Sequence, residues 1–249
     1  MTKFIIIGII AVSVLGLAAC ANRTSAVGEL KSQKVTSDIH SLDIRINAAD
    51  FTIQQGKEFS VESNLKNITI SENNGVLTII EKSHNSVNYN GAMLKLCIPD
   101  GTVFETANIE TGAAKLTANS ISANSIKLKL GAGKADLGNI NAYKDIDIKG
   151  GAGEINVNGG TLNNLSLDLG AGTLYMTTAL IGNNDLKFGI GDSRLTLMGN
   201  QSDYKFDIKN SIGTININNN SVSVGSIGNG NNNIKINGGI GTINISFQE

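Results

Sequence analysis

Two aspartates, Asp185 and Asp207, are the side chains whose type and spacing come nearest to a catalytic pair. The sequence around them repeats about every 20 residues, so a chain wound with this period would place their carboxylates one strand spacing apart, about 4.8 Å. Paired carboxylates at short range can cleave glycosidic bonds. However, Lys187 and Lys209 follow the two aspartates along the same strands. We therefore expect a solvated face of alternating charge, and a polysaccharide-cleaving β-helix is only the remote alternative.

Other catalytic and ligand-binding arrangements are incomplete in this sequence. The two histidines, His40 and His84, are too few for a Ser-His-Asp triad or a histidine-rich zinc site. Residues 150–155, GGAGEI, begin like a calcium-binding G-G-x-G-x-D repeat, but Ile155 takes the place of the aspartate ligand. No glycine signature is followed by the Gly-Lys-Ser/Thr of a phosphate-binding loop. We expect no enzymatic activity, no bound metal and no cofactor.

A Gly-Ala-Gly signature recurs along the second half of the chain and defines the elements that would position these side chains. Its copies begin at Gly112, Gly131, Gly151, Gly170, Gly189, Ser211 and Gly239. Self-similarity at this period is typical of stacked repeats. Glycine tolerates positive φ and lets neighbouring backbones approach closely, so we predict a chain turn at each signature. The predicted turn glycines are Gly131, Gly133, Gly151, Gly153, Gly170, Gly172, Gly189, Gly191, Gly213, Gly239 and Gly241.

Aliphatic residues recur at fixed distances from each signature and predict the buried face. The residue three positions before the signature is always leucine or isoleucine: Ile109, Leu128, Ile148, Leu167, Leu186, Ile208 and Ile236. The residue five positions before and the middle residue of the signature have the same parity, so we expect all three to share the inward face of a strand. After the signature the apolar parity shifts by one residue, which indicates a bend between two strands.

Together, the repeats and strand patterns predict an all-β fold, a parallel β-solenoid (β-helix) with coils of about 19–22 residues. Short alternating strands fill residues 38–100, where Asn74-Gly75 is a strong hairpin signal. We expect this segment to form an N-terminal antiparallel or mixed β cap, because an uncovered end would expose strand edges. The Gly-x-Gly coils occupy residues 101–249, and the two parts form one domain, residues 38–249.

An asparagine-rich segment, residues 218–233, lengthens the last repeat to 28 residues. Asparagine tolerates left-handed backbone and can stack its side-chain amides in ladders. We expect this segment to bulge from the side of the stack, either as a recognition loop or as a disordered excursion.

The first residues of the chain predict secretion and attachment to lipid. Residues 1–19 have one basic residue, then an apolar run too short to span a bilayer, then small residues, as in a signal peptide. The sequence LAAC that ends at Cys20 resembles the lipobox of bacterial lipoproteins. This resemblance implies cleavage before Cys20 and a diacylglycerol, with acyl chains such as palmitate, on its sulfur. Residues 20–37 are mostly small and polar, which predicts a flexible tether. Cys97 would then be the only free thiol, without a disulfide partner.

The charge balance argues against a nucleic-acid partner. Removal of residues 1–19 takes away one basic residue, Lys3, and leaves 19 basic and 21 acidic residues, a formal net charge of −2. Aromatic residues make up 4% of the chain, and lysine and arginine form no stripe in the sequence. Nucleic-acid-binding surfaces are usually basic and often carry stacking aromatic side chains.

Residues 96–101, LCIPDG, and the glycine repeats that follow resemble the bacterial "putative adhesin" domain family, a domain of unknown function with Gly-x-Gly turns between short strands. The resemblance covers about residues 41–249. It implies a β-solenoid in the cell envelope, without known catalytic residues. We expect a non-catalytic protein, anchored to a membrane through Cys20 outside the cytoplasm, that presents a β surface for adhesion or for contact with a protein or glycan. The alternative is an accessory of envelope stress sensing or signalling at the membrane.

Overall fold

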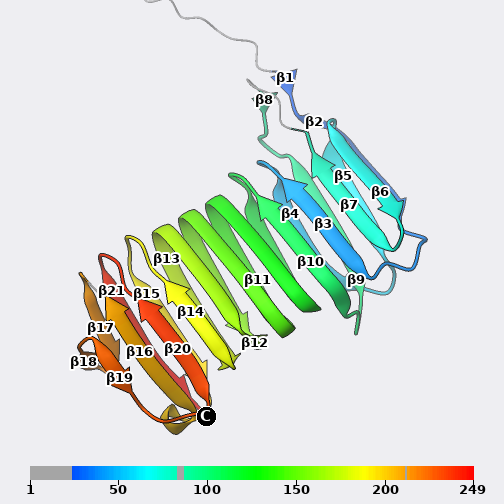
Figure 1. Cartoon of the computed structure of the whole chain (residues 1–249). Coiled ribbons are helices and arrows are strands. Elements are labelled where there is room, and N and C mark those ends of the chain that lie inside the picture. The colour runs from blue at the N-terminus through cyan, green and yellow to red at the C-terminus, as the bar shows by residue number, and fades with distance from the viewer. Residues whose placement is uncertain (1–23, 83–86, 211) are drawn as a thin grey trace, which may run out of the picture.

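The computed structural model describes residues 24–82, 87–210 and 212–249, which form an elongated stack of β-strands (Figure 1). The strands belong to one 19-stranded mixed sheet and to a two-stranded sheet of β1 (Thr24–Ser25) and β8 (Val87–Asn88). Within the described residues the only helix is the short 3-10 helix η1 (Gln201–Asp203). The predicted all-β class is confirmed. Cys20, His84 and the predicted signal peptide lie outside the described residues.

The large sheet forms two layers that face each other across the core. The first layer contains, in spatial order, β6 (Ile68–Asn73), β7 (Val76–Glu81), β3 (Ser41–Ile46), β10 (Phe104–Thr111), segments of β11 (Lys115–Gly159) and β13 (Leu165–Ile181), β14 (Asn183–Lys187), β20 (Asn232–Asn237), β16 (Tyr204–Asn210) and β19 (Gly225–Ile227). The second layer contains β2 (Val27–Lys34), β5 (Ser60–Leu65), β9 (Met93–Pro99), β4 (Asp50–Gly56), further segments of β11 and β13, β15 (Ser193–Met198), β21 (Thr242–Gln248), β17 (Thr214–Ile217) and β18 (Asn220–Val222). β11 and β13 bend at the corners and pass between the layers, and β12 (Thr161–Asn163) lies beside them.

The predicted parallel β-solenoid (β-helix) is wrong, because the strands form a mixed sheet that is not closed. Parallel pairs fill the middle of the stack, whereas β2, β6, β18 and β19 pair antiparallel at its ends. The order of strands also differs from sequential winding. β3 lies between β7 and β10, and β20 lies between β14 and β16. β3 and β20 are thus each inserted between two strands that are closer to each other in sequence. β3 belongs to the parallel stack, although it was expected in the cap.

Antiparallel strands cover the open ends of the stack. The hairpin expected at Asn74 and Gly75 is confirmed: both residues have positive φ, 48° and 71°, and they join β6 to β7. At the opposite end, Asn218 and Asn219 have φ of 48° and 63° and turn the chain from β17 into β18. The asparagine-rich segment 218–233 therefore contributes the edge strands β18 and β19, and the expected lateral bulge is wrong. Such edge strands shield the parallel strands behind them from pairing with other chains.

The segment predicted as a flexible tether, residues 20–37, contains a paired strand. β2 runs antiparallel to β5, with Val27 opposite Leu65 and Lys34 opposite Ser60. After its first two residues, the side chains of β2 are exposed. Its sequence therefore lacks the alternation of apolar and polar residues that usually indicates a strand. Within the described residues, the chain is held to the fold from β1 onward.

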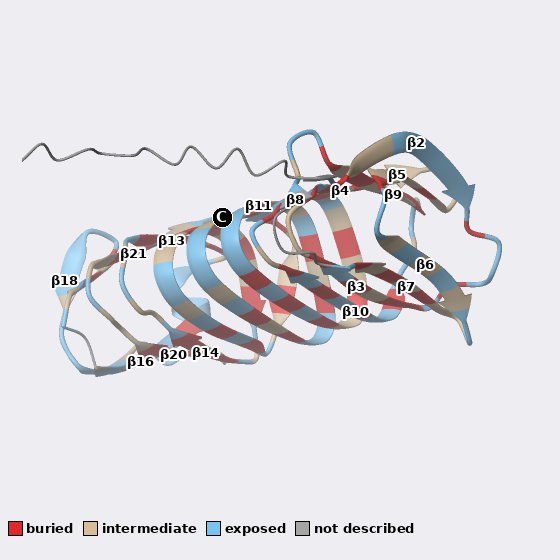
Figure 2. Ribbon diagram, turned by 90° about the horizontal axis from the view of Figure 1, so that it is seen from above, coloured by how far each residue is buried: buried red, intermediate tan, exposed pale blue. Residues whose placement is uncertain are grey.

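Aliphatic side chains fill the space between the layers. The row three positions before the signatures is confirmed as buried, with neighbours aligned in register, Ile109 with Leu128 and Ile148 with Leu167. Figure 2 shows buried and exposed residues alternating along β11 and β13. Asn184 is the polar member of the next row and is 3% exposed. Its amide donates to the carbonyl oxygens of Gly182 and Asn233, and its oxygen accepts the backbone N–H of Leu165, so its burial leaves no polar atom without a partner.

Replacing a glycine that meets a neighbouring backbone should destabilise the stack. Gly191 has φ of 138°, and a Cβ added there would lie 1.8 Å from the carbonyl oxygen of Gly172. We predict that Gly191→Ala lowers the free energy of unfolding by about 2–4 kcal/mol, measured by urea denaturation. The control is Gly101→Ala, where φ is 77° but no atom lies within 4 Å, and a loss of about 1 kcal/mol is expected. Equal losses would contradict the role of close packing.

Tyr204 should make the C-terminal end of the stack sensitive to alkaline pH. It is almost fully buried beside Phe206 and Phe247, and its hydroxyl donates to the carbonyl oxygen of Met198 at 2.6 Å. Burial raises the pKa of the Tyr204 phenol above its ordinary value of 10.0. The unfolded chain therefore loses this proton at lower pH than the folded chain, and the free energy of unfolding should fall as the pH rises above about 10.

Comparison of Tyr204→Phe with the wild type by urea denaturation, at neutral and at alkaline pH, isolates this contribution. The variant should lose about 1 kcal/mol at neutral pH with the hydrogen bond, yet show a shallower alkaline decrease. Tyr143→Phe changes an exposed tyrosine and should keep the wild-type decrease. An unchanged alkaline slope in Tyr204→Phe would disprove the assignment.

Candidate functional site

The corner at which the glycine signatures stack is the surface that differs most from an ordinary sheet. The predicted turn glycines lie along this corner, which we call the glycine edge. A Cβ added to any of them would lie between 1.7 and 2.7 Å from a carbonyl oxygen of the adjacent repeat. The backbones of adjacent repeats are therefore in direct contact here, and no side chain fits between them.

The middle residue of each signature points outward at this edge, which corrects the expected inward orientation. Ile190, Ile240 and Ile212 are 60%, 52% and 83% exposed. The chain bends at the first residue of the signature, so the residue that follows no longer shares the face of the preceding strand. Parity alone had not located the bend. The alanines at the equivalent positions, Ala113, Ala132, Ala152 and Ala171, are also exposed.

Four large aliphatic side chains form a continuous line at one end of the glycine edge. Ile190 pairs in parallel with Ile240, and the bond from the Thr214 N–H to the Gly241 oxygen places Ile212 on the far side of Ile240. Val224 extends the line, because the antiparallel registers of β18 and β19 carry their connection across the same corner. Val224 is 64% exposed. We call Ile190, Ile240, Ile212 and Val224 the apolar ridge.

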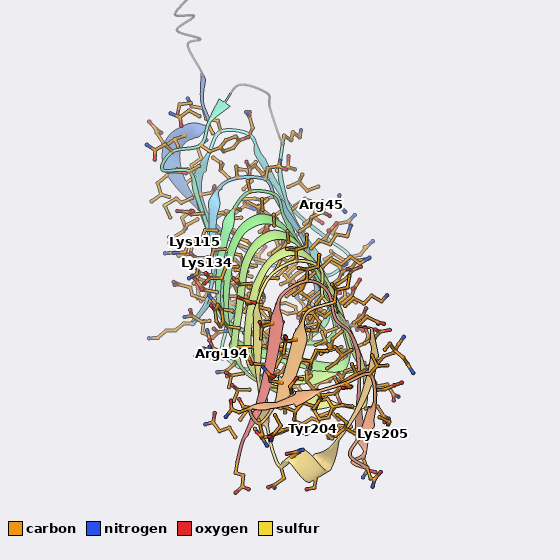
Figure 3. All side chains as sticks on the ribbon, turned by 90° about the vertical axis from the view of Figure 1, so that its left-hand side faces the viewer. Arg45, Lys115, Lys134, Arg194, Tyr204 and Lys205 are labelled. Atoms are coloured by element: carbon orange, nitrogen blue, oxygen red, sulfur yellow. The ribbon has the colours of Figure 1, made fainter. Side chains whose placement is uncertain are left out.

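Basic side chains outnumber acidic ones in the rows next to the glycine edge. On the first layer the exposed basic residues are Arg45, Lys129, Lys149, Lys187 and Lys209, and on the second layer they are Lys115 and Lys134. Figure 3 shows Arg45 on one side of the stack and Lys115 and Lys134 on the other. The acidic residues in the same rows are Glu110 and Asp168 on the first layer and Asp50, Glu154 and Asp192 on the second layer. The whole chain has a formal net charge of −1, so this edge is basic relative to the rest of the chain.

Hydrogen bonds and ion pairs fix part of this charge. Lys134 Nζ lies 2.9 Å from Glu154 and 3.4 Å from Asp136, which raises the pKa of Lys134. The Asn156 amide donates to Glu154 at 2.8 Å, and this bond, followed by that from Lys134, lowers the pKa of Glu154. Both groups therefore stay charged across the neutral pH range.

The two aspartates considered as a catalytic pair are not neighbours. β20 lies between β14 and β16, so Lys235 is opposite both Asp185 and Asp207. Its Nζ atom is 3.3 Å from an Asp185 carboxylate oxygen, while Lys209 pairs with Asp207 at 2.7 Å. Each carboxylate thus faces an ammonium group, and the acid–acid proximity that glycosidases use is absent at this position. Sequence reasoning did not place Lys235 between the two aspartates, because it assumed that repeats stack in chain order.

A polar row crosses the second layer beside the glycine edge. Asn156 donates to Asp136 at 2.7 Å, and Asn216 donates to Asn244 at 2.9 Å. Between these pairs, the guanidinium carbon of Arg194 lies 5.9 Å from the centre of the Tyr175 ring, which is 43% exposed. We call Asp136, Asn156, Tyr175, Arg194, Asn244 and Asn216 the polar row.

Other sequence candidates lie apart from one another. His40 is near Glu105, 3.4 Å between Nδ1 and the carboxylate, at the N-terminal end of the stack. Cys97 is half-buried and its sulfur accepts a hydrogen bond from Gln54 at 3.3 Å. No group of three metal-binding side chains forms among the described residues. In the described part of the chain, no helix has the length and apolar character to cross a bilayer.

No protein-family model and no curated protein sequence matches the chain. Among solved structures, a "putative adhesin" from Bacteroides fragilis aligns over 89% of this chain and 99% of its own, with 10% identity and a TM-score of 0.44. A "putative lipid binding protein" from Parabacteroides distasonis aligns over 91% and 100%, with 15% identity and a TM-score of 0.41. A "putative cell adhesion protein" from Clostridium sporogenes aligns over 88% and 99%, with 15% identity and a TM-score of 0.36. These TM-scores are below 0.5, so the likeness assigns no function to this chain.

Proposed function

We propose that this protein is a non-catalytic component of the bacterial cell envelope, anchored by lipid at Cys20, that presents its β surface to a protein or glycan. The insertion of Lys235 between Asp185 and Asp207 is the observation that supports this proposal best. Because of this insertion, the two carboxylates that most resembled a catalytic pair are not adjacent. The outward side chains are instead joined to their neighbours across strands, which suits a fixed surface for contact.

The polar row is the part of this surface best suited to a glycan. Its amides offer donors and acceptors to sugar hydroxyl groups, and the half-exposed Tyr175 ring offers a flat apolar face. Hydrogen bonds from Asn156 and Asn216 and the stacking of Arg194 on Tyr175 hold these groups in place before any ligand binds. Preorganised side chains lose less conformational entropy on binding.

Binding of bacterial envelope polysaccharides should depend on Tyr175. On a panel of immobilised polysaccharides, we predict that Tyr175→Ala weakens the binding of the best ligand by about tenfold or more. Tyr143→Ala removes a similarly exposed tyrosine elsewhere and should leave affinity unchanged. Equal affinity of both variants and the wild type would reject the polar row as the site. Cleavage of a polysaccharide that disappears in Asp185→Ala would overturn the non-catalytic assignment.

The lipid anchor is tested separately by mass spectrometry of the mature N-terminus. We predict a chain that begins at Cys20 with diacylglycerol on its sulfur and that fractionates with membranes. Cys20→Ser should lack this mass and bind membranes more weakly than the wild type, because the acyl chains are lost. A mature chain that begins elsewhere, or an unmodified Cys20, would contradict the anchor.

A further inference from the structure

The four large aliphatic side chains of the apolar ridge are exposed, and the fold does not require them. Its side chains are 52–83% exposed and lie in consecutive strands, whereas isolated exposed apolar residues are common and scattered. The equivalent positions of earlier repeats carry alanine, so the stacking of the edge does not require a large side chain. A contiguous apolar line on a surface usually marks a contact.

The shape of the ridge favours a deformable apolar medium as its partner. The four side chains project from the corner and form a line one residue wide. Their neighbours on the edge are glycine and alanine, so the ridge stands above a surface made mostly of backbone. Acyl chains can close around such tips without a complementary pocket.

Charge around the ridge favours an anionic surface. Lys187 and Lys209 lie in the row beside Ile190 and Ile212 on the first layer, and Asp192 and then Arg194 follow Ile190 on the second layer. The first-layer row continues along the glycine edge through Lys149, Lys129 and Arg45, interrupted by Asp168 and Glu110, so its basic residues outnumber its acidic ones five to two. Basic residues that flank an exposed apolar stripe attract anionic lipid headgroups.

The first described residues lie at the same edge. The carbonyl oxygen of Ala26 accepts a hydrogen bond from the Lys66 N–H, just after β5. β9 lies between β5 and β4, and β4 begins three residues after Asn47, whose carbonyl oxygen lies against Gly112 of the first glycine signature. Figure 1 shows β1 on the side to which the arrowheads of β3, β14 and β20 point, which is the side of the glycine edge. Cys20 is four residues before Thr24. Along this edge, β2 and the start of β15 beside Ile190 are separated by about eight strand spacings, or roughly 38 Å.

We propose that the protein lies lengthwise on an anionic bilayer along its glycine edge, with the apolar ridge inserted among the acyl chains. The inference rests on the proposed lipid anchor for the choice of bilayer, but the ridge itself contacts lipid without it. Ile190, Ile240, Ile212 and Val224 enter the apolar layer at the end far from β1. The basic rows contact phosphate groups along the length of the stack.

Vesicle binding of unacylated protein tests the ridge independently of Cys20. The chain from residue 21 onward contains every strand of the structure and no site for the predicted acylation. It should sediment with vesicles of phosphatidylcholine and phosphatidylglycerol, and about tenfold less with phosphatidylcholine alone. The triple variant Ile190→Ser, Ile240→Ser, Ile212→Ser should bind the anionic vesicles about tenfold more weakly. The control Val103→Ser, Tyr143→Ser changes two exposed apolar residues away from this edge and should bind as the wild type does.

A single tryptophan gives a second readout, because the chain contains none. Ile240→Trp should show a blue-shifted emission with anionic vesicles, whereas Val103→Trp should not. Failure of the wild type to bind, equal binding by the triple variant, or an unshifted Ile240→Trp spectrum would each overturn the proposal. So would a dimer in sedimentation that the triple variant abolishes, because the ridge would then join two copies of the chain. Circular dichroism confirms that each variant is folded.

Discussion

The contact of backbone on backbone at the glycine edge is the constraint on which the rest of the structure depends. Carbonyl oxygens of one repeat lie where Cβ atoms of the next repeat would otherwise be. Adjacent repeats therefore stack at a fixed distance and in a fixed register. That register aligns Ile109 with Leu128 and Ile148 with Leu167 in the core. It also aligns the outward rows, so a charge or an aliphatic side chain in one repeat meets its counterpart in the next.

Local patterns predicted the parts of the fold that depend on local geometry. The hairpin at Asn74 and Gly75 and the buried row that contains Leu128 follow from backbone preference and side-chain parity, which a single sequence displays. The order of the strands does not. Leu186, Ile208 and Ile236 are equivalent as stacking partners, and nothing local indicates that Ile236 lies between the other two.

The two errors at the candidate site have different origins, strand order and the position of a bend. Asp185 and Asp207 were placed side by side because their repeats follow each other in sequence, yet Lys235 comes between them. The outward direction of Ile190 was missed because a shift of parity shows that a bend exists but not which residue makes it. The apolar ridge and its basic flanks were therefore visible only after the repeats had been placed in space.

The insertion of β20 and β21 has a consequence for how the protein reaches its native state. Both strands are made after β16 and β17, yet they separate these strands from β14 and β15. A nascent chain that has emerged only as far as β17 cannot keep β16 against β14 if it is to mature correctly. Long-range pairing of this kind slows folding, because the chain loses the entropy of loop closure before the stabilising contacts form. Maturation of this region must therefore wait until translation, and any export across a membrane, has delivered β21.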